Sequence, residues 1–276
     1  MDNIFSFLKS VITIMIPVYF AALGGLFPAL AGTLNIALEG LLLISAFSSL
    51  AVYYISGNVM AAILAAVITA MVMSLIHVFA AFKLRANLFI TGLAVNLFSS
   101  GLCVLLSDKL FKTKGVITAS FNSGLLKWYV IFGLFLLLIT WLAIYKTPFG
   151  YRLRASDKNT EALVSLGIKP GNYQIISIII SGFFCGIGGS FLSLNLGSYV
   201  PGMSAGKGWI ALAVIFLGLR RPLGILAAAF IFALAESFSN YAQGFWNIPS
   251  DFILAFPYIC TLIAIIIVSI IGKKEK

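Results

Sequence analysis

Long apolar runs alternate with short polar segments along the whole chain. A membrane-spanning helix needs about 20 residues, and most of these runs come close to that length. The run at 209–219 is too short to cross alone, so we expect a half-helix there or an extension back through the glycine-rich segment 197–208. Nine runs are legible, at approximately 11–30, 38–55, 59–82, 88–106, 128–145, 173–194, 209–219, 223–241 and 252–271.

The composition agrees with a protein that crosses the membrane many times. Hydrophobic residues make up 61% of the chain and charged residues 9%, and the mean hydropathy is +1.10. A soluble domain would carry about a quarter charged residues. We therefore expect an all-α polytopic bundle of about nine spans (range eight to ten), with residues 1–276 forming a single transmembrane domain surrounded by membrane lipid. The formal charge of +10 lies in short loops and does not indicate nucleic-acid binding.

Lysine and arginine are distributed unequally between the two sets of alternate loops. One set, which includes the C-terminal tail, holds twelve of these residues, and the opposite set holds six. Because short cytoplasmic loops carry the excess of positive charge, we expect the first set and the C-terminus in the cytoplasm. The first set comprises Lys83, Arg85, Lys146, Arg152, Arg154, Lys158, Lys169, Arg220, Arg221, Lys273, Lys274 and Lys276.

The segment 31–40, AGTLNIALEG, interrupts two apolar runs with two glycines, the amide of Asn35 and the carboxylate of Glu39. A carboxylate at hydrocarbon depth costs roughly 3 kcal/mol, so it is normally found facing a bundle interior or a water-filled path. One interpretation is a polar loop at the membrane surface with a solvated Glu39. The other is a broken helix that lines a route through the bilayer, with Asn35 and Glu39 on one face because they are four residues apart.

Asn96 and Glu236 are further polar residues within apolar runs. Each is suited either to interhelical hydrogen bonds, worth roughly 0.6 kcal/mol per contact, or to the lining of the same route. His77 is the one histidine and has no second metal-ligating residue near it, so we expect it to pack. The three cysteines stand alone in apolar runs, and the sequence predicts neither a disulfide framework nor a metal site.

The longest polar segment, residues 146–172, is predicted to hold a short helix. Asn159 can cap it, and Glu161 in its first turn is favoured by the helix dipole. Gly167 suits the C-terminal cap, and Pro170 prevents continuation.

The same short helix has a small apolar face. Ala162, Leu163 and Leu166 are expected to share it, at the spacing i, i+1, i+4. Such a helix can dock another protein or lie flat on the lipid surface. Its flanks are basic, with Arg152, Arg154 and Lys158.

Two stretches indicate an internal repeat. The sequence after Gly40, LLLISAF, is followed by a second small-residue helix from Gly57, and WIALAVI after Gly208 is followed by another from Gly224. In the orientation above, the run after Gly40 goes outward and the run after Gly208 goes inward. This is the arrangement of an inverted repeat, whose broken helices flank a translocation path.

No catalytic arrangement is legible. The glycine-rich segment 181–190, SGFFCGIGGS, follows no strand and leads to no Gly-Lys-Ser/Thr, so we interpret Gly182, Gly186 and Gly189, with Gly40, as sites of close helix packing. The chain has no G-x-x-x-x-G-K-[ST] motif, so any nucleotide hydrolysis is expected in another subunit. We expect a transport subunit and not an enzyme.

Four stretches resemble the permease subunits of bacterial ABC importers in the branched-chain amino acid, ribose and nucleoside superfamily. Residues 33–40, TLNIALEG, are similar to the LNIG-x-EG signature of the simple-sugar and nucleoside branch. Residues 150–168 are similar to its cytoplasmic loop, although Ser156-Asp157 stands where the family often has a glycine-containing turn. Residues 181–189 resemble its SG-x-x-x-G-x-x-G helix, and GKGWIALAVIFLG at 206–218 resembles its G-x-G-x-x-A-x-A-x-x-x-x-G pattern.

The resemblance implies an importer in the bacterial plasma membrane, built from two permease chains (a homodimer or heterodimer), cytoplasmic ATP-binding cassette ATPases and an external solute-binding protein. This chain would hold no cofactor, and the ATPases would use ATP. Residues 146–172 would form the coupling loop and 160–167 the coupling helix. The residues expected to couple to the ATPase are Arg152, Arg154, Asn159, Glu161, Leu163, Leu166 and Gly167.

The expected function is therefore inward transport of a polar small solute by alternating access, with Asn35, Glu39, Asn96 and Glu236 along the path. Nucleosides are favoured, followed by simple sugars and riboflavin-like compounds. An ion-coupled secondary transporter that uses Glu39 or Glu236 is the alternative from another class. An intramembrane enzyme would require a catalytic constellation that the sequence does not show.

Overall fold

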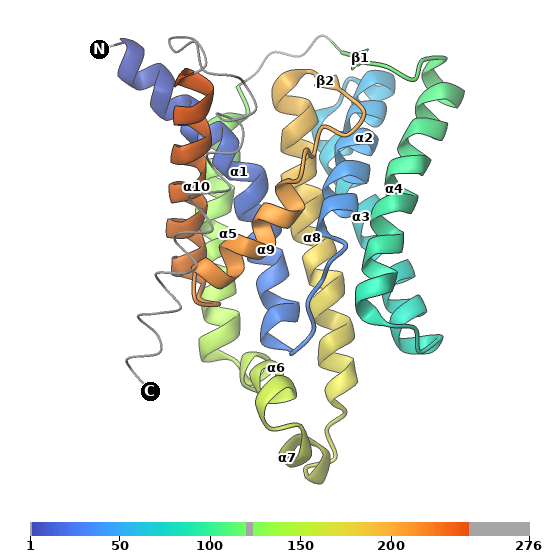
Figure 1. Ribbon diagram of the computed structural model, residues 1–276, viewed down its shortest axis with the longest axis vertical. Coiled ribbons are helices and arrows are strands. Elements are labelled where there is room, and N and C mark those ends of the chain that lie inside the picture. The colour runs from blue at the N-terminus through green and yellow to red at the C-terminus, as the bar shows by residue number, and fades with distance from the viewer. Residues whose placement is uncertain (1, 120–123, 243–276) are drawn as a thin grey trace.

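The computed structural model describes residues 2–119 and 124–242, which form a helical bundle (Figure 1). The predicted all-α class is confirmed. The elements are, in order, α1 (Asp2–Leu30), α2 (Leu38–Ser56), α3 (Val59–Val78), the π-helical turn η1 (Phe79–Lys83), α4 (Leu88–Phe111), β1 (Ile117–Thr118), α5 (Leu126–Lys146), α6 (Pro148–Lys158), α7 (Thr160–Ser165), α8 (Pro170–Leu196), β2 (Ser198–Tyr199), α9 (Lys207–Leu217) and α10 (Pro222–Ala242).

Within the described ranges, seven helices are long and apolar enough to cross a membrane: α1, α2, α3 with η1, α4, α5, α8 and α10. They correspond to seven of the nine predicted runs. The run at 209–219 becomes the 11-residue helix α9, which is too short to cross alone. The run at 252–271 lies outside the described residues, so the predicted count of about nine spans is not confirmed.

Side-chain caps and glycines explain several helix boundaries. Gly57 ends α2 with a left-handed φ of 63°, where a residue without a Cβ is unstrained. Asn58 then caps α3 by accepting hydrogen bonds from the backbone N–H groups of Met60 and Ala61. Asn87 caps α4 in the same way.

The helices α1, α2 and α8 form the centre of the bundle. Their apolar windows are 72%, 67% and 72% buried, against 28% for both α3 and α4. The predicted packing glycines of α8 lie where neighbouring helices come close. A Cβ on Gly186 would lie 2.5 Å from the Cα of Val67 in α3, a Cβ on Gly182 would collide with Ser74 of α3, and one on Gly189 would collide with Ser45 of α2. Small residues at these positions allow the backbones to approach.

The bundle has two distinct ends (Figure 1). One, the β1–β2 end, carries the N-terminus and the antiparallel pair in which Ile117 lies opposite Tyr199. The other, the α7 end, carries α6, α7, the turn between η1 and α4, and the turn between α9 and α10. The basic loops predicted to be cytoplasmic thus share the α7 end as far as they are described.

Two helices begin inside the bundle, each directly after a non-helical segment. We call these segments the first helix break (residues 31–37) and the second helix break (residues 200–206). Residues 31–37 turn back from the end of α1 and lead into α2, which runs toward the β1–β2 end. Residues 200–206 turn back from β2 and lead into α9, which runs toward the α7 end (Figure 1). The two helices that follow the breaks therefore run in opposite directions, as an inverted repeat requires.

Candidate functional site

The first break is held by the buried amide of Asn35, which is 1% exposed. Its Oδ1 accepts a hydrogen bond from the backbone N–H of Ala37 at 3.0 Å, and its Nδ2 donates to the hydroxyl of Ser181 in α8. One side chain thus shapes the turn before α2 and ties it to the central helix α8.

Asn96 of α4 supplies the cap that the N-terminus of α2 lacks. The N-cap residue of α2 is Ala37, which has no capping side chain. The Oδ1 of Asn96 accepts from the backbone N–H of Gly40 at 2.7 Å, and its Nδ2 donates to the carbonyl of Ile36 at 2.9 Å. Gly40 makes this approach possible, because a Cβ there would lie 2.7 Å from the Cα of Asn96.

Glu39 holds the second broken helix. It belongs to the first turn of α2 and does not lie in a surface loop. Its carboxylate accepts hydrogen bonds from the backbone N–H groups of Gly206 at 2.9 Å and Gly208 at 2.7 Å, at the start of α9. The first N–H groups of a helix lack partners within the helix and carry partial positive charge, so a carboxylate is stabilised there.

Close packing accompanies these bonds. A Cβ on Gly208 would collide with the backbone nitrogen of Glu39 and lie 2.5 Å from its Cα. Gly206 has a left-handed φ of 82°, which a glycine adopts without strain. The two glycines of G-K-G therefore let the backbone of α9 reach the first turn of α2.

Glu236 of α10 lies beside Lys207, the first residue of α9. Its Oε1 is 3.8 Å from the Nζ of Lys207, and the two side chains are 22% and 16% exposed. Its Oε2 is buried and has no hydrogen-bond partner among the described residues. The structure therefore places Asn35, Glu39, Asn96 and Glu236 at the two helix breaks, where they hold the breaks in place.

Sequence reasoning missed four partners of these residues: Ser181, Gly206, Lys207 and Gly208. Lys207 directly precedes the short apolar run at 209–219, and nothing near it in the sequence indicates its ion pair with Glu236 of α10. Gly206 and Gly208 belong to a family-like pattern, but nothing in that pattern indicates a carboxylate of α2 as their partner.

The α6–α7 segment protrudes at the α7 end (Figure 1). The guanidinium of Arg154 lies over the rings of Tyr145 and Tyr151, at 5.2 Å and 5.1 Å from their centroids. Arg152 donates to the hydroxyl of Tyr173 at 3.2 Å. Two of the predicted coupling residues are therefore already in contact with aromatic side chains of α5, α6 and α8.

The short helix α7 differs from its prediction in two respects. Asn159 occupies the N-cap position, but its side chain makes no capping bond. Leu163 is 4% exposed and Leu166 is 74% exposed, so the expectation of one shared apolar face is wrong. Ala162 is exposed as well, although it lies within α7, so of the three residues only Leu163 is buried. A helix of six residues that ends at Ser165 has fewer than two turns, too few to present a stripe of apolar positions to the bundle. Glu161 lies in the first turn of α7, and Gly167 follows the helix with a left-handed φ of 74°, as the sequence pattern indicates for both.

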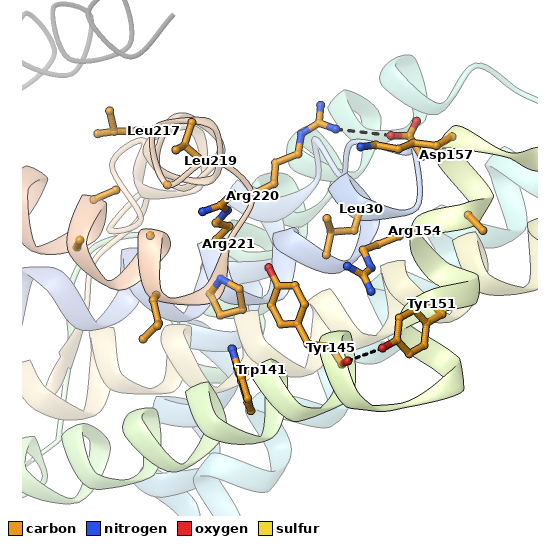
Figure 2. A pocket seen from close by; sticks show the side chains of 18 of the residues that line it. Leu30, Trp141, Tyr145, Tyr151, Arg154, Asp157, Leu217, Leu219, Arg220 and Arg221 are labelled. Carbon is orange, nitrogen blue, oxygen red and sulfur yellow. Dashed lines mark hydrogen bonds and ion pairs between the residues drawn. The ribbon is translucent and has the colours of Figure 1, made fainter. Parts of the chain in front are cut away.

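A cleft of about 1190 Å³ opens beside this segment (Figure 2). Its walls come from the α5–α6 region and from the turn between α9 and α10. Aliphatic and small residues make up much of the lining, together with aromatic and basic side chains, among them Trp141, Tyr145, Tyr151, Arg154 and Arg221.

Comparison with known proteins identifies the family. Residues 7–269 match the family described as the permease component of the branched-chain amino acid transport system. The chain belongs to this family. It is therefore a multi-pass membrane permease, as the resemblance of its four motifs implied.

Among its relatives, the permease is 32% identical to the guanosine ABC transporter permease protein NupQ of Bacillus subtilis, over 94% of this chain and 90% of the relative. It is 28% identical to the nucleoside ABC transporter permease protein NupC of Lactococcus lactis, over 90% of this chain and 87% of the relative. A solved structure, PsaBC from Streptococcus pneumoniae in complex with Fab, has a TM-score of 0.57 at 12% identity, covering 93% of this chain and 90% of that one. The last likeness concerns the fold alone.

Proposed function

We propose that this permease is the membrane-spanning subunit of an ABC importer that moves nucleosides inward. The observation that carries the proposal is the similarity to guanosine and nucleoside permeases along nearly the whole chain. The arrangement of polar residues at the two helix breaks supports it, because broken helices inside a bundle are how transporters build a path at mid-membrane.

In this proposal the path runs beside the crossing of α2 and α9. Asn35, Glu39, Asn96 and Glu236 border it and position the half-helix. Because both carboxylate oxygens of Glu39 are already bonded to α9, Glu39 acts on the solute through the placement of α9. A change in the position of α9 would open the path toward one side or the other, as alternating access requires.

The remaining subunits follow from the same assignment. Cytoplasmic ATPases would dock on α6–α7 and hydrolyse ATP, a second permease chain would complete the path, and a solute-binding protein would deliver nucleosides at the β1–β2 end. The α7 end would then face the bacterial cytoplasm together with the C-terminal tail, in agreement with the twelve basic residues of that set of loops. The exposed side chains of Glu161 and Leu166 would be part of the ATPase contact.

Uptake by intact cells tests the proposal. Cells that carry the complete importer, and the same cells with this permease deleted, would be given radiolabelled guanosine, adenosine, cytidine, uridine, ribose, glucose and riboflavin. We expect nucleoside uptake only with the permease present, and its loss when ATP is depleted while the ion gradient is maintained. Uptake of a sugar or riboflavin instead would refute the substrate class. Nucleoside uptake that persists without ATP would refute the ABC importer and indicate an ion-coupled transporter.

A further inference from the structure

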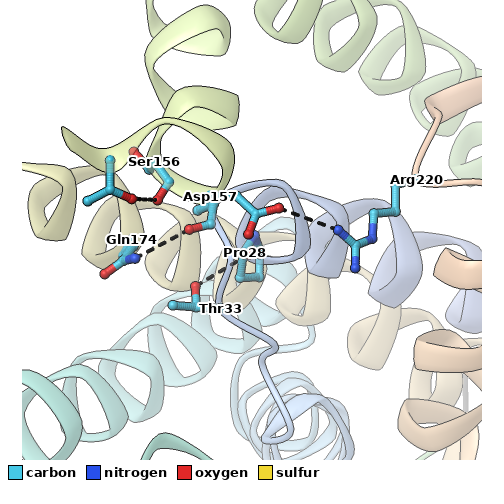
Figure 3. A network of polar contacts seen from close by, with 8 residues as sticks. Pro28, Thr33, Ser156, Asp157, Gln174 and Arg220 are labelled. Atoms are coloured by element: carbon cyan, nitrogen blue, oxygen red, sulfur yellow. Dashed lines mark hydrogen bonds and ion pairs between the residues drawn. The ribbon is translucent and has the colours of Figure 1, made fainter. Parts of the chain in front are cut away.

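Asp157, near the end of α6, packs tightly against the first helix break. Gly32 lies in that break with a left-handed φ of 79°, and a Cβ there would lie 2.8 Å from Oδ1 and 3.2 Å from Cα of Asp157. Two hydrogen bonds secure the same break, from Thr33 to the carbonyl of Pro28 and from Gln174 of α8 to the carbonyl of Ala31 (Figure 3). Helix α6 also packs on α1, α5 and α8. It therefore forms one closely packed unit with the first break.

The turn between α9 and α10 has an unusual backbone. Leu219 and Arg220 are consecutive non-glycine residues with left-handed φ values of 55° and 52°. Residues with a Cβ rarely adopt this backbone conformation, whereas glycine adopts it without strain. Strained residues of this kind gather at switch regions and clamps. The turn is also compact, because a Cβ on Gly218 would lie 2.6 Å from the carbonyl carbon of Gly224.

One ion pair links this turn to α6. The Nη1 of Arg220 lies 3.7 Å from Oδ2 of Asp157, and the pair joins the two walls of the cleft of about 1190 Å³ (Figures 2 and 3). The side chains are 41% and 35% exposed. A pair this exposed contributes little to folding stability, so it can be broken and remade at small energetic cost.

We propose that Asp157 and Arg220 are positioning residues for transport: their ion pair fastens the α9–α10 turn to α6, and its release frees the end of α9 to move. This inference rests on the proposed function. Glu39 holds the start of α9 and Arg220 holds its end, so the half-helix is fixed at both ends in this structure. Displacement of α6–α7 by an ATPase would act on the end of α9 through Asp157.

Charge exchange tests the pair in the complete importer, reconstituted with its ATPases and binding protein. Asp157→Arg and Arg220→Asp should each lower the nucleoside taken up per ATP hydrolysed by about threefold, as expected for the loss of an exposed pair. The double variant Asp157→Arg/Arg220→Asp should restore the ratio. Arg221→Gln, the adjacent arginine in the same cleft, is the matched control and should match wild type. Single variants with the wild-type ratio, or a double variant without rescue, would overturn the proposal.

A distance measurement keeps this test separate from the identity of the solute. Spin labels at Lys158→Cys and Arg221→Cys, beside the pair but outside it, report the separation of the two walls. The separation should differ between the nucleotide-free and the vanadate-trapped complex. An unchanged distance distribution would overturn the proposed role of the Asp157–Arg220 ion pair, even if nucleosides are transported. A wild-type complex that moves no nucleoside would refute the proposed function alone.

Discussion

The N-termini of α2 and α9 both lie inside the bundle, but they are capped by different chemistry. The start of α2 is capped by the neutral amide of Asn96, which binds one N–H and one carbonyl. The start of α9 is capped by the carboxylate of Glu39, which binds two N–H groups. The amide satisfies a donor and an acceptor and adds no charge, whereas the carboxylate places a full negative charge on the helix terminus.

The two helices also differ in how much packing supports them. Helix α2 has 19 residues and lies at the centre of the bundle, while α9 has 11 residues. A short helix gains less from packing and depends more on its ends. We infer that α2 is the fixed member of the pair and that α9, held by Glu39 at one end and by Arg220 at the other, is the member that moves.

The substitution Glu39→Ala should have the largest effect. It leaves the N–H groups of Gly206 and Gly208 without their acceptor, in a half-buried site, and an unsatisfied donor costs about 1–3 kcal/mol where it is fully buried. Thermal unfolding in detergent should show a clearly lower Tm, and uptake should be lost. Asp108→Ala removes a carboxylate from an exposed position and should leave both unchanged. A wild-type Tm for Glu39→Ala would show that the cap does not stabilise α9.

The substitution Gly208→Ala should rank second. Its Cβ would meet the backbone of Glu39, and overpacking of this kind costs about 1–3 kcal/mol. The contacted atoms belong to the backbone of Glu39 and cannot rotate out of the way, so α9 must move away from α2. Both the Tm and the uptake should therefore fall. Gly171→Ala is the matched control, since a Cβ there meets nothing within 4 Å. Equal Tm values for the two alanine variants would contradict the close contact.

The substitution Asn96→Ala should have a smaller effect, about 1 kcal/mol, typical of a lost helix cap. Asn96→Asp sharpens the comparison, because it keeps an acceptor for the N–H of Gly40 but places a carboxylate opposite the carbonyl of Ile36. If the two caps serve different purposes, Asn96→Ala should lower the Tm slightly and retain measurable uptake. Complete loss of uptake at normal expression would place the moving element at α2.

The substitution pair Glu161→Lys/Leu166→Asp should have the smallest effect on stability, within about 0.5 kcal/mol, because both side chains are exposed. Co-purification of the ATPase should nevertheless decrease, and uptake with it. Leu163→Asp is unsuited to this test because Leu163 is buried and its replacement would destabilise α7. Unchanged co-purification and uptake would remove α7 from the ATPase contact.

The sequence predicts the helices well because a bilayer allows no unpaired backbone, so each long apolar run must form a helix. It also singles out Asn35, Glu39, Asn96 and Glu236, because polar groups stand out in apolar runs. The sequence does not identify the hydrogen-bond partners of these four residues. The N–H groups bound by Glu39 lie 167 and 169 residues away in the chain, and backbone donors leave no mark on a sequence. The prediction that Leu166 lies on the apolar face of α7 is wrong because local contacts, more than the spacing of apolar residues, determine where a six-residue helix ends.

Hydrogen–deuterium exchange in lipid nanodiscs tests the capping of α9 by Glu39 most directly. Peptides that cover residues 200–212 should exchange slowly in the wild-type permease and faster in Glu39→Gln, which replaces one acceptor oxygen with a donor. Peptides at the start of α2, whose cap comes from Asn96, should exchange alike in both proteins. Equal exchange at residues 200–212 in the two proteins would contradict the assignment of Glu39 as the group that holds α9.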